Sequence, residues 1–201
     1  MSSDIQSTFI EAAALDADGI SVAAAVGDGA SLVIGGALAS GGSVTFDQPR
    51  NVTILSAGDD SGISFTVTGT DETGDSATES ITGANAGTAT GSSYFTTVTA
   101  IAAVGDPAGN VSAGSGTAIA APMFRGRMRL RGIYAVNTGT AGTTTFRQTS
   151  SSGAVRMKFN TVASANTTQY PDVPDDGILF IAGGYILYTQ TTLSSITVFY
   201  S

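Results

Sequence analysis

Cysteine, histidine and tryptophan are absent from the 201-residue chain. Without cysteine and histidine the protein has no disulfide, no thiol nucleophile, no zinc site of the usual Cys/His kind and not the commonest general base at neutral pH. The lack of tryptophan also removes a large aromatic platform for a sugar ring. These absences leave little catalytic chemistry, and we expect a protein that is not an enzyme and that carries no cofactor or metal ion.

Charged residues are scarce, at 12% of the chain, and long hydrophobic runs are missing. The stretch 31–44 is too short and too rich in glycine to cross a bilayer, which takes about 20 apolar residues. The start, Met1–Asp4, has no basic segment followed by an apolar core, so it does not resemble a secretory signal. We therefore expect a soluble protein with no membrane partner.

Glycine is abundant, with 26 residues, and alanine, serine, threonine and valine dominate the remainder. This mixture is typical of short β-strands joined by tight turns. Ile63, Phe65 and Val67 alternate with polar residues, as in a strand with one buried face, and the loop Asp71–Asp75 leads to a returning strand at 77–81. The predicted fold class is all-β, with two antiparallel β-sandwich domains of the jelly-roll or immunoglobulin-like kind and a short N-terminal arm.

The expected boundaries are 1–19 for the arm, 20–116 for an acidic β-sandwich domain and 117–201 for a basic one. Ile5, Phe9 and Ala13 recur at helical spacing, which predicts a short helix within 7–15 or an ordered arm. The alternatives are a frayed terminus and an arm that orders only against another subunit. The composition of 105–121 is that of a linker or a strand edge. Further strands are expected at 31–34, 44–46, 52–55, 94–104, 124–136, 143–148, 154–160, 178–181, 185–189 and 195–200.

The two halves of the chain differ in charge. Residues 1–120 contain one basic residue, Arg50, and thirteen acidic ones, whereas residues 121–201 contain seven basic and three acidic residues. Four of these bases, Arg125, Arg127, Arg129 and Arg131, occupy every second position of an expected strand, which would place four guanidinium groups on one face. Because such a row repels itself unless anions face it, we predict that these arginines are interface charges. The facing carboxylates would come from the acidic half of the chain, a sister subunit or an acidic protein surface.

Two other interpretations of the arginine row remain open. A solvated strand face that serves only solubility is the simpler one, since charged strand faces are common. A nucleic-acid platform is the other, but the net charge of −8, the single lysine, Lys158, and the absence of a basic run with interleaved aromatic residues argue against it. We therefore expect no nucleic-acid partner.

Three acidic loops are candidate calcium sites: Asp16–Gly19, Asp59–Gly62 and Asp71–Asp75. Closely spaced carboxylates suit a hard cation, but none of these loops has the twelve-residue pattern with a distal glutamate. Paired carboxylates of a glycosidase are disfavoured as well, because these acids are adjacent in the sequence and lie in turns. Ordinary turn chemistry accounts for all three loops.

Two sets of motifs carry a family resemblance. Residues 30 to 105, with Gly35–Gly42, Pro49–Ile54, Ser56–Gly62, Phe65–Thr70 and Gly83–Thr88, resemble a β domain of small virion proteins of tailed bacteriophages, notably marine and cyanobacterial ones. The second half, with Leu130–Tyr134, Gly139–Gly142, Pro174–Phe180 and Ile196–Tyr200, is similar to another recurrent phage segment. The resemblance implies a virion structural protein and brings no catalytic residues.

Within that resemblance, the expected role is that of a capsid decoration or cement protein. Such a protein would bind the major capsid protein on the exterior of the virion and stabilise the head, and the resemblance implies a homo-oligomer, with a trimer favoured. The interface hypothesis names Arg125, Arg127, Arg129 and Arg131, with the arm Ser2–Leu15 as a second contact. The alternatives are a neck or tail component of the phage and a module that binds host-surface glycans.

Overall fold

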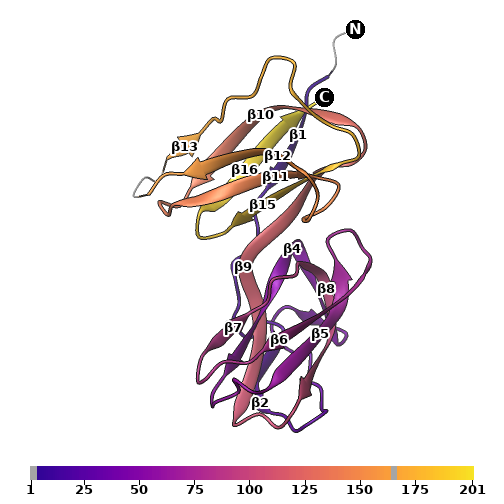
Figure 1. Ribbon diagram of the computed structural model, residues 1–201, viewed down its shortest axis with the longest axis vertical. Helices are drawn as coiled ribbons and strands as arrows, with labels where there is room; N and C mark the ends of the chain where they lie inside the picture. Colours follow the sequence, from indigo (N-terminus) through magenta and orange to yellow (C-terminus); the bar gives the residue numbers. More distant parts are fainter. Residues whose placement is uncertain (1–3, 164–166) are drawn as a thin grey trace. The chain divides into compact units, whose positions relative to one another are not determined.

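The computed structural model describes residues 4–163 and 167–201, and within these ranges the protein is all-β, with sixteen strands and no helix. The chain divides into two compact units (Figure 1). The central unit comprises residues 14–117, and the terminal unit combines 118–201 with the residues up to Ala13. The sheets are antiparallel and pack as a β-sandwich, which confirms the predicted all-β sandwich class.

The central unit is built around the long strand β4. Its ladder order is β9–β4–β8–β5–β6, with β2 paired to β9 and with β3 and β7 paired to β4. Val44 and Thr45 of β4 pair with β8, whereas Thr53 and Leu55 pair with β7, and the register is irregular between them. The strands are β2 (Ser21–Ala25), β3 (Ala39–Ser40), β4 (Ser43–Ser56), β5 (Ser64–Asp71), β6 (Ser76–Thr82), β7 (Thr88–Thr90), β8 (Phe95–Val104) and β9 (Asn110–Phe124), whose second part continues into the terminal unit.

The alternating pattern of the predicted hairpin is confirmed. Phe65 and Val67 of β5 are fully buried while their neighbours are partly exposed, and β6 returns after the loop 72–75. These two side chains belong to the hydrophobic core of the central unit, to which several of its strands contribute buried apolar residues. The fully buried members of this core are Ile20, Val44, Val52, Ile54, Phe65, Val67, Phe95, Val98, Ile101, Ala103, Val111 and Ala113.

The terminal unit consists of two sheets. One has the order β1–β16–β10–β13, with β14 also paired to β10, and the other has the order β12–β11–β15–β9. Between them lies a separate core that includes Phe124, Phe146 and Phe180, and the rings of Phe124 and Phe180 meet edge to face at 5.2 Å. The strands are β1 (Gln6–Ile10), β10 (Met128–Asn137), β11 (Gly142–Gln148), β12 (Val155–Thr161), β13 (Thr168–Gln169), β14 (Ile178–Phe180), β15 (Gly184–Thr189) and β16 (Leu193–Tyr200).

The helix predicted within 7–15 is wrong, because this segment contains strand β1. Residues Gln6–Ile10 pair with Ile196–Tyr200 of β16, and the two strands lie side by side in Figure 1. Ile10 is 1% exposed whereas Phe9 is 61% exposed, so the burial follows the two-residue period of a strand. Pairing with a strand nearly 190 positions away overrides the weak local preference for a helix.

The linker or strand edge predicted at 105–121 is also wrong over most of its length. Strand β9 begins at Asn110, lies between β2 and β4, and is buried from Val111 to Gly116. The small residues permit close packing, because a Cβ at Gly116 would lie 2.3 Å from Asn51 Oδ1. Two strand assignments also change: Ser31 forms only an isolated bridge with Ala102, and the strands expected at 44–46 and 52–55 are both parts of β4.

Candidate interaction surface

The four arginines do not occupy one strand. Strand β9 ends at Phe124 and β10 begins at Met128, so Arg125 and Arg127 lie in the connecting turn, where both are exposed. Gly126 has a φ of 75° at the centre of this turn, a left-handed conformation that glycine adopts without strain. The prediction that all four guanidinium groups share one strand face is therefore wrong, while the interface role of these residues stays a prediction.

Arg129 and Arg131 do lie in β10, and both donate hydrogen bonds to neighbouring uncharged oxygen atoms. Arg129 Nη1 donates to Asp176 O at 2.9 Å, and Arg131 Nη1 donates to Asp175 O at 2.9 Å. Arg131 Nε also donates to Ser201 Oγ at 2.8 Å. Because these acceptors are uncharged, the hydrogen bonds position the guanidinium groups without cancelling their positive charge.

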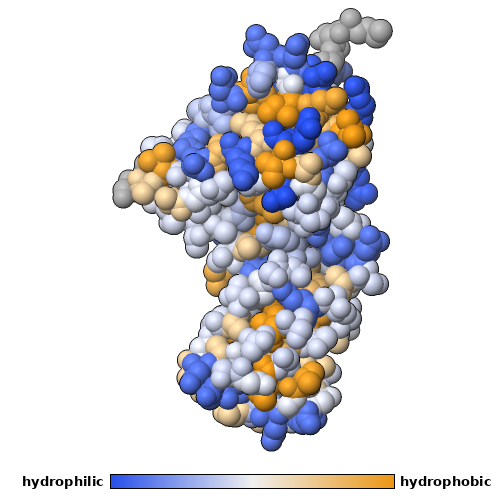
Figure 2. All heavy atoms as spheres, in the orientation of Figure 1, coloured by the Kyte–Doolittle hydropathy of each residue, from blue (hydrophilic) through white to orange (hydrophobic). Residues whose placement is uncertain are grey.

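Apolar and aromatic side chains cover the outer side of the same sheet. The inward residues of β1, β16 and β10 include Ile10, Val198 and Ile133, all buried in the core. The alternate residues point outward, and Ile5 and Phe9 near the chain start are 66% and 61% exposed. On the face of the terminal unit that Figure 2 shows, hydrophobic residues also lie at the surface among hydrophilic ones.

The register brings these outward residues together across the strands. Phe199 of β16 lies opposite Ser7 of β1 on one side and opposite Gly132 of β10 on the other. Tyr134, two residues along β10, contacts Tyr170 beyond β13 with a distance of 5.2 Å between ring centroids. We call this surface the outer face and define it by Ile5, Phe9, Arg129, Arg131, Tyr134, Tyr170 and Phe199.

The outer face includes exposed aromatic and aliphatic side chains and two arginines. Aromatic residues and arginine are enriched in protein interfaces, whereas lysine and acidic residues are depleted at their centres. Strand β1 forms one end of this sheet's order, so it also offers a free strand edge for pairing. The sequence contains an indication of this exposed face, since Ile5 and Phe9 both fall on odd positions and so on one side of a strand. The same residues also fit helical spacing, which is why a helix is the predicted element.

The division of charge persists in the three-dimensional units. The central unit holds eleven acidic residues and one arginine, a net charge of −10, and the terminal unit holds five acidic and seven basic residues, a net charge of +2. The outer face therefore belongs to the less acidic unit. Its two arginines, Arg129 and Arg131, add positive charge beside the exposed apolar side chains.

The acidic loops show turn chemistry. Asp71 Oδ1 accepts hydrogen bonds from the amide and the hydroxyl of Thr73 at 2.8 and 2.7 Å, and from Asp75 N at 3.0 Å. Burial raises the pKa of Asp71, but these hydrogen bonds outweigh it and hold the pKa below its ordinary value. The hydroxyl of Ser61, followed by its amide, lowers the pKa of Asp59 in the same way. In the described part of the chain no three acidic side chains gather as metal ligands would.

Comparison with known proteins gives no relative for this chain: no family model, no curated protein and no solved structure matches it. Over residues 4–163 and 167–201, no helix has the length and apolar character needed to cross a membrane.

Proposed function

We propose that this protein is a structural component of a phage particle that binds the exterior of the capsid and stabilises the head. The observation that supports an assembly role is the outer face, which exposes aromatic and aliphatic side chains over several strands beside two positioned arginines. Exposed apolar surfaces of this kind mark sites of protein contact. The virion setting rests on the resemblances of the two halves to phage proteins.

Binding through the outer face would stabilise the shell by mass action. A protein with affinity only for the assembled capsid shifts the equilibrium toward the assembled state by an amount that grows with its concentration relative to its dissociation constant. Phe9 and Phe199 would supply the apolar contact, while Arg125, Arg127, Arg129 and Arg131 would select an acidic patch on the major capsid protein. The expected homotrimer would present three copies of this surface.

The test is binding of purified protein to capsids that lack it. We expect Phe9→Ser to weaken binding at least ~10-fold, or about 1.4 kcal/mol, because an aromatic side chain that becomes buried in an interface contributes this much or more. The matched control is Val33→Ser, which removes an apolar side chain of the central unit that is 76% exposed. Equal affinity of the Phe9 variant and the natural protein would contradict the role of the outer face.

The alternative of a neck or tail component is separated by copy number. Quantitative mass spectrometry of purified particles would give a ratio to the major capsid protein near one to one or one to a few for a decoration protein. A ratio of one to tens would move the protein to the neck or tail, and its absence from particles would overturn the virion proposal.

A further inference from the structure

A second feature of the terminal unit is an open groove of about 300 Å³. It lies between β12 on one side and β13 with the residues that directly follow it on the other. Phe159 and Asn160 line one side, and Gln169, Tyr170 and Pro171 line the other. The two strands belong to different sheets of the sandwich, so the groove lies where the sheet margins approach each other. None of these five lining residues carries a charge.

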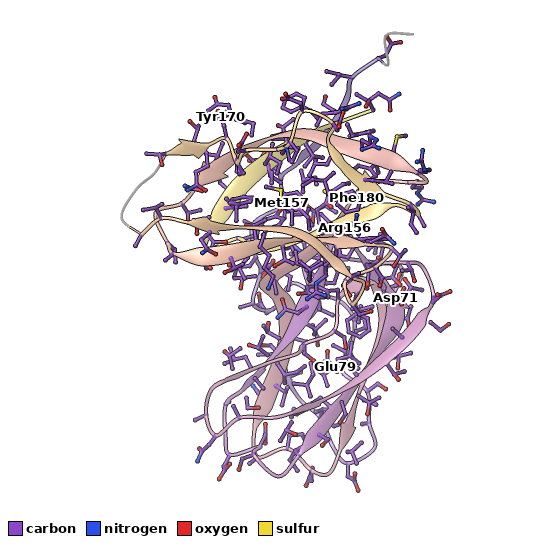
Figure 3. All side chains as sticks on the ribbon, turned by 45° about the horizontal axis from the view of Figure 1, so that its top comes forward. Asp71, Glu79, Arg156, Met157, Tyr170 and Phe180 are labelled. Carbon is purple, nitrogen blue, oxygen red and sulfur yellow. The ribbon has the colours of Figure 1, made fainter. Side chains whose placement is uncertain are left out.

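Two aromatic rings line the groove, that of Phe159, which packs against the core, and that of Tyr170, which is exposed. Phe159 packs against the core, with its ring 6.0 Å from that of Phe146. Tyr170 is 71% exposed, and its contact with Tyr134 limits the orientations of its ring. Figure 3 places Tyr170 at the margin of the terminal unit, whereas Phe180 lies inside it. The Tyr170 ring is therefore exposed and restricted in orientation by Tyr134, so it provides a flat apolar surface for a ligand.

The amide side chains beside the ring carry hydrogen-bonding capacity. Gln169 Nε2 donates to Asn160 O at 3.4 Å, and Asn160 Oδ1 accepts from Thr143 Oγ1 at 2.9 Å. Gln169 Oε1 is shielded from water, and the described residues give it no hydrogen-bond donor. A buried acceptor is destabilising if it stays without a donor. A ligand hydroxyl that enters the groove, with a small rotation of the Gln169 amide, would supply one.

We propose that this groove binds a neutral oligosaccharide. A sugar ring offers an apolar C–H face, which would lie on Tyr170, and hydroxyl groups around its rim, which would meet Asn160 and Gln169. The uncharged lining disfavours acidic sugars and charged peptides, whose charges would lose water without a partner. A proline-rich peptide also binds aromatic grooves, but here amide side chains alternate with the rings, which favours a ligand with many hydroxyls.

The experiment is a nuclear magnetic resonance titration of the isotope-labelled full chain. The probes are maltohexaose, cellohexaose, mannohexaose and N-acetylchitohexaose at up to about 10 mM, a range that detects millimolar dissociation constants. We expect at least one probe to give saturable shifts of the Asn160, Gln169 and Tyr170 amides. A decaproline peptide is titrated in parallel, and saturable shifts of the same amides with this peptide alone would overturn the sugar proposal.

Three variants locate the binding. Tyr170→Ala should weaken binding of the responding sugar at least ~10-fold, or about 1.4 kcal/mol. Tyr170→Phe should keep it, since the ring remains, and Phe9→Ala is the control for loss of an exposed ring elsewhere in the unit. Unchanged Phe146 signals would show that each variant is folded. Absence of saturable shifts with all four sugars, or full affinity of folded Tyr170→Ala for the responding sugar, would overturn the sugar proposal. The capsid proposal is tested separately, by the capsid binding of Phe9→Ser.

Discussion

Arg50 shows how a charged residue can be part of a β-sandwich core. Its side chain is 1% exposed, Nη2 donates to Asp47 Oδ1 at 2.8 Å, and the guanidinium carbon lies 5.7 Å from the centre of the Phe46 ring. It follows the register irregularity of β4, where residues 49–52 are buried in succession and the alternation of inward and outward side chains is lost. The Arg50 side chain is therefore buried because the strand is irregular at this point. The alternation of residues in the sequence does not predict this burial.

Asp71 gives a residue-scale prediction of pH dependence. Because the folded-state pKa is held below the value of 3.8 that is usual for an aspartate, the hairpin gains stability from Asp71 above that pH. That gain is lost as the pH falls through the lowered pKa. Thr73→Val removes the hydroxyl that donates to Asp71 at 2.7 Å. We expect the variant to raise the pKa of Asp71, measured by titration of its carboxyl carbon signal.

The matched control for this titration is Thr78→Val, which makes the same chemical change at an exposed position of β6 in the same hairpin. Its Asp71 pKa should equal that of the natural protein. If Thr73→Val also left the Asp71 pKa unchanged, the turn amides of Thr73 and Asp75 rather than the hydroxyl would account for the lowered value.

At the scale of elements, the pairing of β5 with β8 depends on Gly69. The register shifts between Thr68 and Gly69, and a Cβ at Gly69 would lie 1.9 Å from Thr97 O. This neighbour is main chain of the paired strand, so Gly69→Ala must displace the ladder. We expect it to lower the free energy of unfolding by about 1–3 kcal/mol or more, as crowding in a packed interior does. Chemical denaturation followed by circular dichroism measures this loss.

The control for Gly69 is Gly62→Ala, because a Cβ at Gly62 meets nothing within 4 Å. The change at this position should alter the free energy of unfolding by less than ~0.5 kcal/mol, as is usual for surface substitutions. Equal stabilities of the two variants would mean that the β5–β8 ladder tolerates a side chain at the register shift.

The same elements explain what the sequence could predict. The β5–β6 hairpin follows from local information, because Phe65 and Val67 alternate with polar residues and the turn residues directly follow them. Strand β1 could not be predicted locally, because it forms by pairing with β16 at the opposite end of the chain. Strand β9 could not be predicted either, because its small residues allow close packing but form no alternating hydrophobic pattern. The alternation of the four arginines is visible in the sequence, but the turn at Gly126 that separates Arg125 and Arg127 from β10 depends on where β9 ends and β10 begins.

On the scale of the whole molecule, the outer face and the groove depend differently on distant parts of the chain. The outer face requires the N-terminal segment, where Ile5 directly precedes β1 and Phe9 lies in β1, at the opposite end of the sequence to Phe199. The groove takes all its lining residues from 159–171. Loss of the N-terminal segment should therefore remove part of the outer face while leaving the residues of the groove in place.

Deletion of the first thirteen residues tests how the two cores are coupled. The deletion removes Ile10 from the terminal core, the bond from Thr8 Oγ1 to Met123 O at 2.8 Å and the bond from Gln190 Nε2 to Ala12 O at 2.9 Å. Since loss of one large buried side chain costs about 2–5 kcal/mol, the terminal unit should lose at least that much stability. Hydrogen exchange of the Ile196 and Val198 amides should then become faster by orders of magnitude.

The central unit provides the internal control in the same experiment. Phe65 and Val67 belong to a core that shares no buried residue with the terminal core, so their amides should keep their protection. Cooperative units that open separately exchange with separate free energies. If the deletion accelerated exchange equally in both units, the chain would unfold as one cooperative body, and strand β9, which continues through both units, would be the element that couples them.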